Sequence, residues 1–282
     1  MELIVIGAGP AYTDRRGAAA SSYLVTAGGE ALLLDIGQGA FSNLAAETEP
    51  SSLTAILVSH LHPDHFVDLV PLRHYLKWEF DPPRRARVLG PAQLADRLDA
   101  LDGHEGFSAT SLDIEALAEG VCRIGPFEVE ARRVAHAGES YAFRVTAGGG
   151  AAAVTAGAAA HGTGDGGAAG KGGTAAGGGL ANGRGPALVY SGDCARAADL
   201  LPLIHPGDTL LSEASFGAGP VAPGAQHITA AEAGAVAATG GAAHLLLTHV
   251  LSGHSRTEIL TAARAAFAGT VQLVTEGDRF EV

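Results

Sequence analysis

The segment SHLHPDH (residues 59–65) gathers three imidazole groups and one carboxylate in a single short stretch. His60 and His62 are separated by one residue, so both can point the same way from an extended segment. Asp64 and His65 come after the proline and turn elsewhere, which allows one loop to present two ligands to each of two metal ions. Imidazole and carboxylate groups suit Zn²⁺, and also Mn²⁺ or Fe²⁺. The spacing therefore predicts a metal centre.

The elements that must position this loop alternate between strand and helix patterns. Residues 54–59 form an apolar run that predicts a buried strand leading directly into the histidines. Two earlier apolar runs joined by Gly28-Gly29 predict a hairpin, and helical spacing follows at 66–78 and 91–101. The later part of the chain predicts strands at 127–137, 140–147, 187–194, 209–215, 244–250 and 271–277, and helices at 195–204, 229–239 and 256–267. This order predicts an α/β protein with two mixed sheets face to face and helices outside, a four-layer α/β/β/α sandwich.

Residues from about 147 to 186 differ in composition from the rest of the chain. Roughly three-quarters of them are Gly or Ala, without periodicity and with almost no large side chain. Such a stretch cannot bury enough apolar surface to offset its ordering entropy. Because a strand pattern resumes directly after it, we expect a disordered insertion in a loop of a single domain spanning 1–282.

Charge and composition exclude several classes of protein. The formal net charge of −12 argues against a broad surface for binding nucleic acid, so such binding is not favoured. Cys122 and Cys194 lie far apart and provide no disulfide framework. The first residues lack the pattern of a signal peptide, and no long apolar run predicts a membrane span or a membrane partner. We expect a cytoplasmic protein.

Further motifs at predicted strand ends give the sequence a family resemblance. HLHPDH (60–65) matches the H-x-H-x-D-H signature of the metallo-β-lactamase superfamily. The other motifs of that superfamily follow the same order along the chain: Asp35 in LLLDIGQG, His136 in VAHAGESYAFRV, Asp193 in YSGDC and His249 in LLLTHV. The resemblance spans residues 3 to 282, except for the Gly/Ala-rich insertion.

The resemblance implies a site for two divalent metal ions, with zinc favoured and manganese or iron as alternatives. It assigns the ligands to three groups: His60, His62 and His136 on the first ion, Asp64, His65 and His249 on the second, and Asp193 as the bridge. Asp35 would lie behind the ligands and fix one histidine by a hydrogen bond. Alternatively, Asp35 caps the turn that follows it.

The segment from Glu213 to His249 narrows the resemblance. SEASF (212–216) and QHITAAE (226–232) look like the corresponding parts of ribonuclease Z and related phosphodiesterases. In those enzymes a Glu and a His at these positions act near the leaving oxygen. The resemblance therefore implies catalytic roles for Glu213 and His227, in addition to one for Asp64. A histidine poised by a carboxylate can supply a proton near neutral pH. The alternative for His227 is a residue that only precedes the start of a helix.

Two departures from relatives decide between activities. Antibiotic-hydrolysing members of the superfamily commonly place a cysteine on the second metal ion, whereas Asp193 offers a hard oxygen here. This difference argues against a β-lactamase. Ribonuclease Z carries a basic arm for tRNA where this chain has the 147–186 tract, in which Lys171 and Arg184 are the basic residues. We therefore expect a phosphodiesterase for 3′,5′-cyclic nucleotides or similar small phosphodiesters. The alternatives are tRNA 3′-processing and a non-catalytic binding protein on the same fold. Analogy with the group also allows a homodimer.

Overall fold

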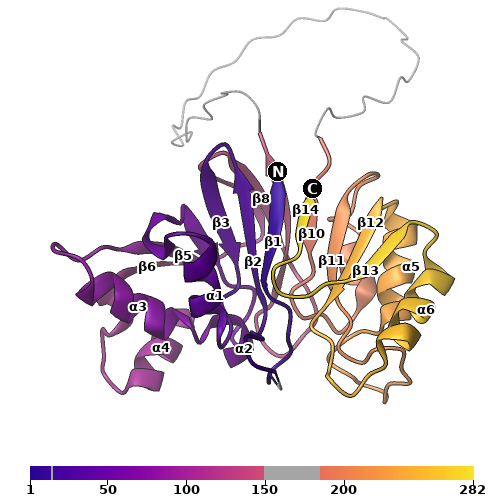
Figure 1. The fold of residues 1–282 in the computed structure, drawn as a ribbon, viewed down its shortest axis with the longest axis horizontal. Helices are drawn as coiled ribbons and strands as arrows, with labels where there is room; N and C mark the ends of the chain where they lie inside the picture. The colour runs from indigo at the N-terminus through magenta and orange to yellow at the C-terminus, as the bar shows by residue number, and fades with distance from the viewer. Residues whose placement is uncertain (14, 149–184) are drawn as a thin grey trace, which may run out of the picture.

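The computed structural model describes residues 1–13, 15–148 and 185–282. Most of the predicted insertion, residues 149–184, lies outside the described residues. Two sheets pack face to face in the centre, and both termini lie near the same end of the strands (Figure 1). None of the helices in the described part combines the length and the apolar character that crossing a bilayer requires.

Each sheet has seven strands, and part of each sheet is parallel. The first sheet has the order β14 (Arg279–Glu281), β1 (Glu2–Gly7), β2 (Ser22–Ala27), β3 (Glu30–Leu34), β4 (Ala55–Leu57), β5 (Ala86–Gly90) and β6 (Leu112–Ala116). The second has the order β13 (Thr270–Leu273), β12 (His244–Thr248), β11 (Thr209–Glu213), β10 (Leu188–Tyr190), β9 (Tyr141–Ala147), β8 (Phe127–Arg133) and β7 (Gly120–Ile124). Strands β3 to β6 are parallel, and so are β10 to β13.

Helices cover the outer face of each sheet. The described helices are α1 (Ala40–Glu47), α2 (Pro63–Phe66), α3 (Leu69–Trp78), α4 (Leu94–Asp102), α5 (Ala230–Gly240) and α6 (Arg256–Ala266), with short 3₁₀ turns at Pro50–Ser52, Ser108–Thr110 and Ala197–Leu200. Helices α1, α3 and α4 flank the first sheet, while α5 and α6 flank the second (Figure 1). The layers confirm the predicted α/β/β/α sandwich.

Alternation along the strands explains why the sheets pack in this way. In β3, Leu32 and Leu34 enter the core between the sheets, while Leu33 packs under the helices of the first layer. In β12, Leu246 faces the other sheet and its neighbour Leu245 packs beneath α5 and α6. Side chains of a strand point to opposite faces in turn, so a strand that is apolar throughout must be covered on both sides.

Several predicted elements occur, and one does not. The hairpin turns at Gly28 and Gly29, which both have positive φ, and α5 begins after Thr229, whose side chain forms a reciprocal capping box with Glu232. The helix predicted over 195–204 is wrong, because only a short 3₁₀ turn, Ala197–Leu200, forms there. In this segment the apolar residues pack against the second sheet without a continuous helical face.

Candidate metal centre

The predicted ligands come from loops of both sheets and meet at one end of the sandwich. Residues 59–65 follow β4, and His136 follows β8, while Asp193 and His249 follow the carboxyl ends of β10 and β12. Ligand atoms fall into two groups with the membership that the sequence predicted: His60, His62, His136 and Asp193, and Asp64, His65, Asp193 and His249. Asp193 belongs to both groups.

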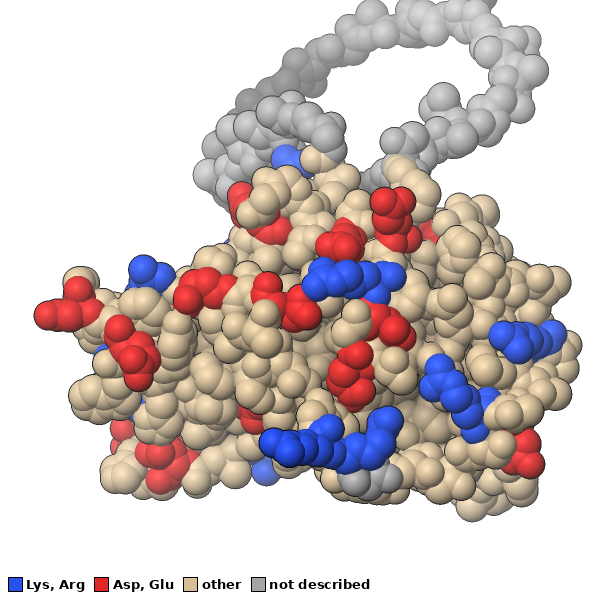
Figure 2. Space-filling model, viewed as in Figure 1, with Lys and Arg blue, Asp and Glu red and all other residues tan. Residues whose placement is uncertain are grey.

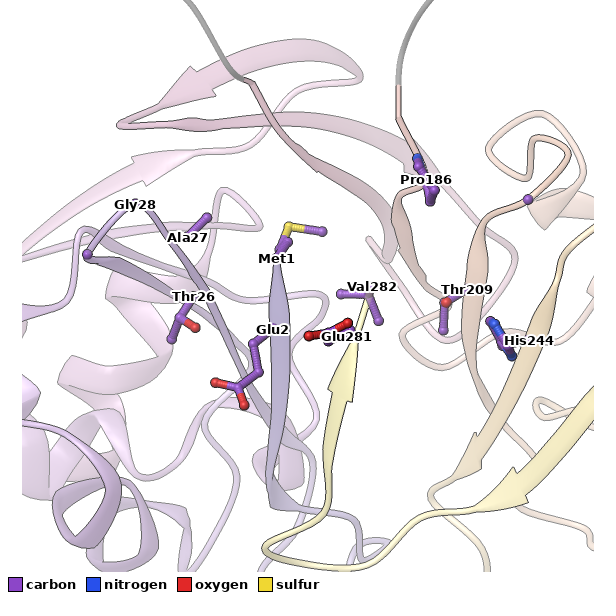
Figure 3. Close-up of a pocket in the computed structure, with 12 residues that line it drawn as sticks. Met1, Glu2, Thr26, Ala27, Gly28, Pro186, Thr209, His244, Glu281 and Val282 are labelled. Atoms are coloured by element: carbon purple, nitrogen blue, oxygen red, sulfur yellow. The ribbon is translucent and has the colours of Figure 1, made fainter.

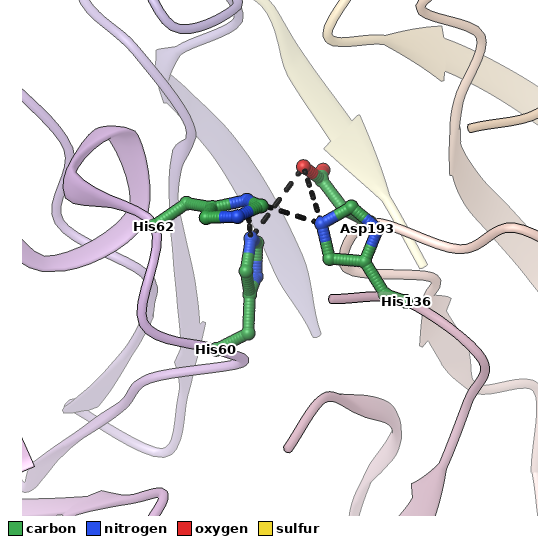
Figure 4. A group of neighbouring side chains, drawn as sticks. All are labelled: His60, His62, His136 and Asp193. Atoms are coloured by element: carbon green, nitrogen blue, oxygen red, sulfur yellow. Dashed lines mark hydrogen bonds and ion pairs between the residues drawn. The ribbon is translucent and has the colours of Figure 1, made fainter. Parts of the chain in front are cut away.

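The first group brings three ring nitrogens together (Figure 4). His62 Nδ1 lies 3.0 Å from His60 Nε2 and 3.1 Å from His136 Nε2. The other ring nitrogen of His136, Nδ1, donates to the carbonyl of Gln226 at 2.8 Å, which leaves a lone pair on Nε2. His60 Nδ1 is likewise engaged, 3.1 Å from Ser59 Oγ. The converging atoms are therefore His60 Nε2, His62 Nδ1 and His136 Nε2.

The second group is more deeply buried. His249 Nε2 lies 3.1 Å from Asp64 Oδ2, and His65 Nε2 lies 3.7 Å from the same oxygen. Asp64 and His65 occupy the first turn of α2, which begins at Pro63 directly after His62. The proline starts the helix and so turns the second pair of side chains away from the first pair.

The carboxylate of Asp193 faces both groups. Its Oδ2 lies 3.5 Å from His60 Nε2 and 3.8 Å from His136 Nε2, whereas Oδ1 lies 3.3 Å from His65 Nε2 and 3.7 Å from His249 Nε2. Both oxygens, and also His65 Nε2, are buried without a hydrogen-bond partner in the described part of the chain. Buried polar atoms are nearly always paired, so these orphaned atoms fit divalent cations lying between them.

Burial sets the protonation of the first group. It lowers the pKa of His60 well below its ordinary value and also lowers the pKa of His62 and of His136. Neutral imidazole is the form that binds a metal ion. Although burial opposes ionisation of Asp193, His249 and His65 hold the pKa of that carboxyl well below its usual range. The first group thus combines neutral imidazoles with a carboxylate. In the second group burial opposes a charge on His65, but Asp193 and Asp35 raise its pKa well above the ordinary value.

Asp35 lies behind the ligands, as the resemblance implied. It is fully buried, and its Oδ2 accepts hydrogen bonds of 2.7 Å each from His65 Nδ1, Ser59 Oγ and Tyr190 OH. The backbone N–H of Ser59 donates to Oδ1 at 2.6 Å. Asp35 and His249 both have left-handed backbone, with φ of 58° and 54°. Such strain tends to be retained at functional sites.

A match to a family decides the identity of the chain. The sequence model described as beta-lactamase superfamily domain matches residues 31–250, which include every predicted ligand. The chain belongs to the metallo-β-lactamase superfamily. An uncharacterized protein of Mycobacterium leprae is 30% identical over 270 residues, covering 93% of this chain and 82% of that protein.

Solved structures show the same fold. The metallo-β-lactamase fold protein YhfI of Bacillus subtilis gives a TM-score of 0.78 at 23% identity, with 99% of each chain covered. The short form of human tRNase Z gives a TM-score of 0.66 at 20% identity, covering 100% of this chain and 99% of that chain. Superfamily membership together with the two His/Asp groups supports a metal-dependent hydrolase that binds divalent ions.

A third group of side chains borders the candidate metal centre. His227 Nδ1 lies 3.1 Å from both carboxylate oxygens of Glu213, and the His227 ring stacks on His249 with centroids 5.7 Å apart. Burial opposes a charge on His227, but the hydrogen bond and the charge of Glu213 raise its pKa above the ordinary value. Ser215 Oγ joins this group, at 2.6 Å from Glu213 Oε2.

Sequence reasoning missed Ser215 and Tyr190. Tyr190 ends β10 and Ser215 follows β11, two strands whose apolar pattern was recognised, but nothing in the pattern shows which polar group lies opposite either residue. The motifs SEAS and YSGD, which place each residue within three positions of a site residue, were the available signal.

A separate pocket lies far from the candidate metal centre. It has a volume of about 840 Å³ and is lined by Met1, Val282, Thr209 and His244 among others (Figure 3). Thr209 and His244 are the first residues of β11 and β12, whereas Glu213 and His249 lie at the carboxyl ends of those strands. The pocket and the metal centre therefore lie at opposite ends of the second sheet.

Proposed function

We propose that this protein is a dinuclear metal-dependent phosphodiesterase acting on 3′,5′-cyclic nucleotides or similar small phosphodiesters. The observation that carries the proposal is the His227–Glu213 pair placed directly beside Asp193. His227 Nδ1 lies 3.8 Å from Asp193 Oδ2, so a group held at the bridging carboxylate is within reach of the His227 ring.

The first proposed role is metal binding. His60, His62, His136, Asp64, His65 and His249 would hold two divalent ions, zinc in the first instance, with Asp193 shared between them. Divalent ions bound there supply Lewis acidity, which lowers the pKa of water and stabilises negative charge on a phosphoryl group. The donors are imidazole and carboxylate without thiolate, a set that also suits manganese or iron.

His227 provides the proton that cleavage of a phosphodiester requires. Glu213 accepts from Nδ1, which leaves Nε2 directed away from the carboxylate, and the His227 side chain is 22% exposed. A protonated imidazole at the edge of the site can donate to the departing alkoxide, a contribution of about 10²–10⁴ in rate. Glu213 is 1% exposed and holds the ring in place.

Charge supports a small substrate over tRNA. The chain has a net charge of −12, and basic groups are interspersed with acidic groups on the face shown in Figure 2. A tRNA body needs an extended basic surface, because phosphate contacts dominate the affinity for nucleic acid. A small phosphodiester needs only the metal centre and its immediate rim.

A substrate panel tests the proposal. Metal-loaded protein should hydrolyse cAMP and bis(p-nitrophenyl) phosphate, and a chelator should abolish both reactions. His227→Ala should lower kcat by about 10²–10⁴ and leave the metal content unchanged. The matched control is His244→Ala, since His244 is exposed at the opposite end of β12.

Other outcomes would overturn it. Cleavage of precursor tRNA with no hydrolysis of cyclic nucleotides would favour the tRNA-processing alternative. Protein that opens thioesters or lactones but leaves every phosphodiester intact would refute the substrate class. A metal content far below two equivalents, with no turnover, would favour a binding protein on this fold.

A further inference from the structure

Ser215 lies between the Glu213 carboxylate and two histidine rings. Its Oγ lies 2.6 Å from Glu213 Oε2, 2.8 Å from His249 Nδ1 and 3.2 Å from His227 Nδ1. The side chain is 2% exposed, so water has little access to these contacts. The hydroxyl is therefore committed to partners within the protein.

The direction of each hydrogen bond follows from the number of protons. A carboxylate can only accept, and a hydroxyl has a single proton to donate. The shortest contact, to Glu213, takes that proton, and Glu213 also accepts the N–H groups of Cys194 at 2.6 Å and of Ser215 itself at 3.3 Å. The lone pairs of the Ser215 oxygen then remain to accept from His249. Nδ1 of His249 must carry the proton that fills this contact.

The tautomer of His249 is fixed as a result. With a proton on Nδ1, the lone pair lies on Nε2, which faces Asp64 at 3.1 Å and Asp193 at 3.7 Å. We infer that Ser215 is a positioning residue for the second metal ion, linking the ligand His249 to the buried charge of Glu213. The inference rests on the metal centre of the proposed function, but it is independent of the substrate.

This link gives Glu213 two tasks. It holds the ring of His227 directly, and through Ser215 it holds His249. A change at Glu213 therefore disturbs the proton donor and the metal site together, whereas a change at His227 disturbs the proton donor. Ser215 is the residue that connects the two tasks.

Three variants test the role of Ser215 without any substrate. Ser215→Ala removes the hydroxyl, and Ser215→Thr retains it. Ser212→Ala removes a buried hydroxyl on β11, the strand that precedes Ser215, which donates to a backbone carbonyl. Zn²⁺ affinity is measured by competition with a chromophoric chelator, and Co²⁺-loaded protein reports ligand geometry by its visible absorption. Loss of a contact behind a ligand typically weakens metal binding 10–100-fold.

We expect Ser215→Ala to bind one of two Zn²⁺ ions about 10–100-fold more weakly and to change the Co²⁺ spectrum. Ser215→Thr and Ser212→Ala should bind both ions like the native protein. Unchanged affinity in Ser215→Ala, or equal losses in Ser215→Ala and Ser212→Ala, would overturn the inference. If Ser215→Ala does not fold, weakened binding in a folded Ser215→Thr would also overturn it. Native protein that binds two ions, responds to Ser215→Ala and cleaves no phosphodiester would refute the proposed function alone.

Discussion

Replacing Asp35 by Asn probes how the protein prepares His65 for metal binding. Asn has nearly the same shape and tolerates the left-handed backbone at this position, where φ is 58°. The carboxylate accepts four hydrogen bonds, one at Oδ1 from Ser59 N and three at Oδ2 from Ser59 Oγ, His65 Nδ1 and Tyr190 OH. An amide has one accepting oxygen, so it cannot reproduce this pattern.

Either orientation of the amide places two donors face to face. With its oxygen toward the backbone N–H of Ser59, the NH₂ group of the new side chain faces Nδ1–H of His65. With the amide reversed, the NH₂ group faces the Ser59 N–H, whose present contact is 2.6 Å. A buried donor left unpaired costs about 1–3 kcal/mol. The cost in the first orientation is relieved if the His65 proton moves to Nε2.

That movement removes the lone pair that a metal ion needs. His65 Nε2 is a buried atom with no hydrogen-bond partner in the described structure, and it lies 3.3 Å from Asp193 Oδ1. We therefore expect Asp35→Asn to weaken binding of the second ion 10–100-fold. On a free-energy scale this is about 1.4–2.8 kcal/mol.

Chelator competition with Zn²⁺ measures the two affinities, and circular dichroism measures Tm. The matched control is Asp68→Asn, because Asp68 is a half-buried carboxylate that accepts the backbone N–H of Phe41 at 2.8 Å. The control should change stability without changing metal affinity. If Asp35→Asn lowers Tm yet binds both ions as tightly as the native protein, the tautomer reasoning is wrong.

Three other perturbations test the surroundings of the centre. Gly37→Ala would place a Cβ 2.0 Å from the carbonyl oxygen of Asp64, so it should cost at least about 1–3 kcal/mol and lower both Tm and metal content, while Gly253→Ala meets nothing within 4 Å and should do neither. Tyr190→Phe should weaken metal binding, and Tyr23→Phe should not, although the centroids of the two buried rings lie 5.0 Å apart, because the Tyr23 hydroxyl bonds to Thr248 and not to Asp35. Removing bound ions with a chelator should lower Tm, because each ion present at 100 times its Kd contributes about 2.7 kcal/mol of stability; a Tm that does not respond would argue against metal binding in the native state.

The ligand groups could be predicted because their spacing is local and their order matches a superfamily. His60, His62, Asp64 and His65 share one loop, and Pro63 separates them into two pairs through the start of α2. The remaining ligands follow strands that the apolar pattern had already located. Strand ends at one edge of a sheet meet in space, so the order of the motifs was sufficient to place them together.

The contacts behind the ligands could not be predicted in the same way. Tyr190 is 155 residues from Asp35 in the chain, and Ser215 is 34 residues from His249. The contact of Tyr190 with Asp35 depends on how the two sheets pack against each other, and that of Ser215 with His249 depends on the pairing of β11 with β12 in the second sheet. The helix predicted at 195–204 failed for a related reason, since tertiary packing of its apolar residues outweighed the helical propensity of the segment.

The two sheets supply matching supports to the second metal ion. Asp35, which follows β3 of the first sheet, holds His65 directly, while Glu213, at the end of β11 of the second sheet, holds His249 through Ser215. Tyr190 of the second sheet also donates to Asp35, so one support depends on both sheets. A small displacement of one sheet against the other would break the Tyr190–Asp35 contact while leaving each sheet's own ladder intact. Metal affinity should therefore respond to changes in sheet packing that secondary structure alone does not reveal.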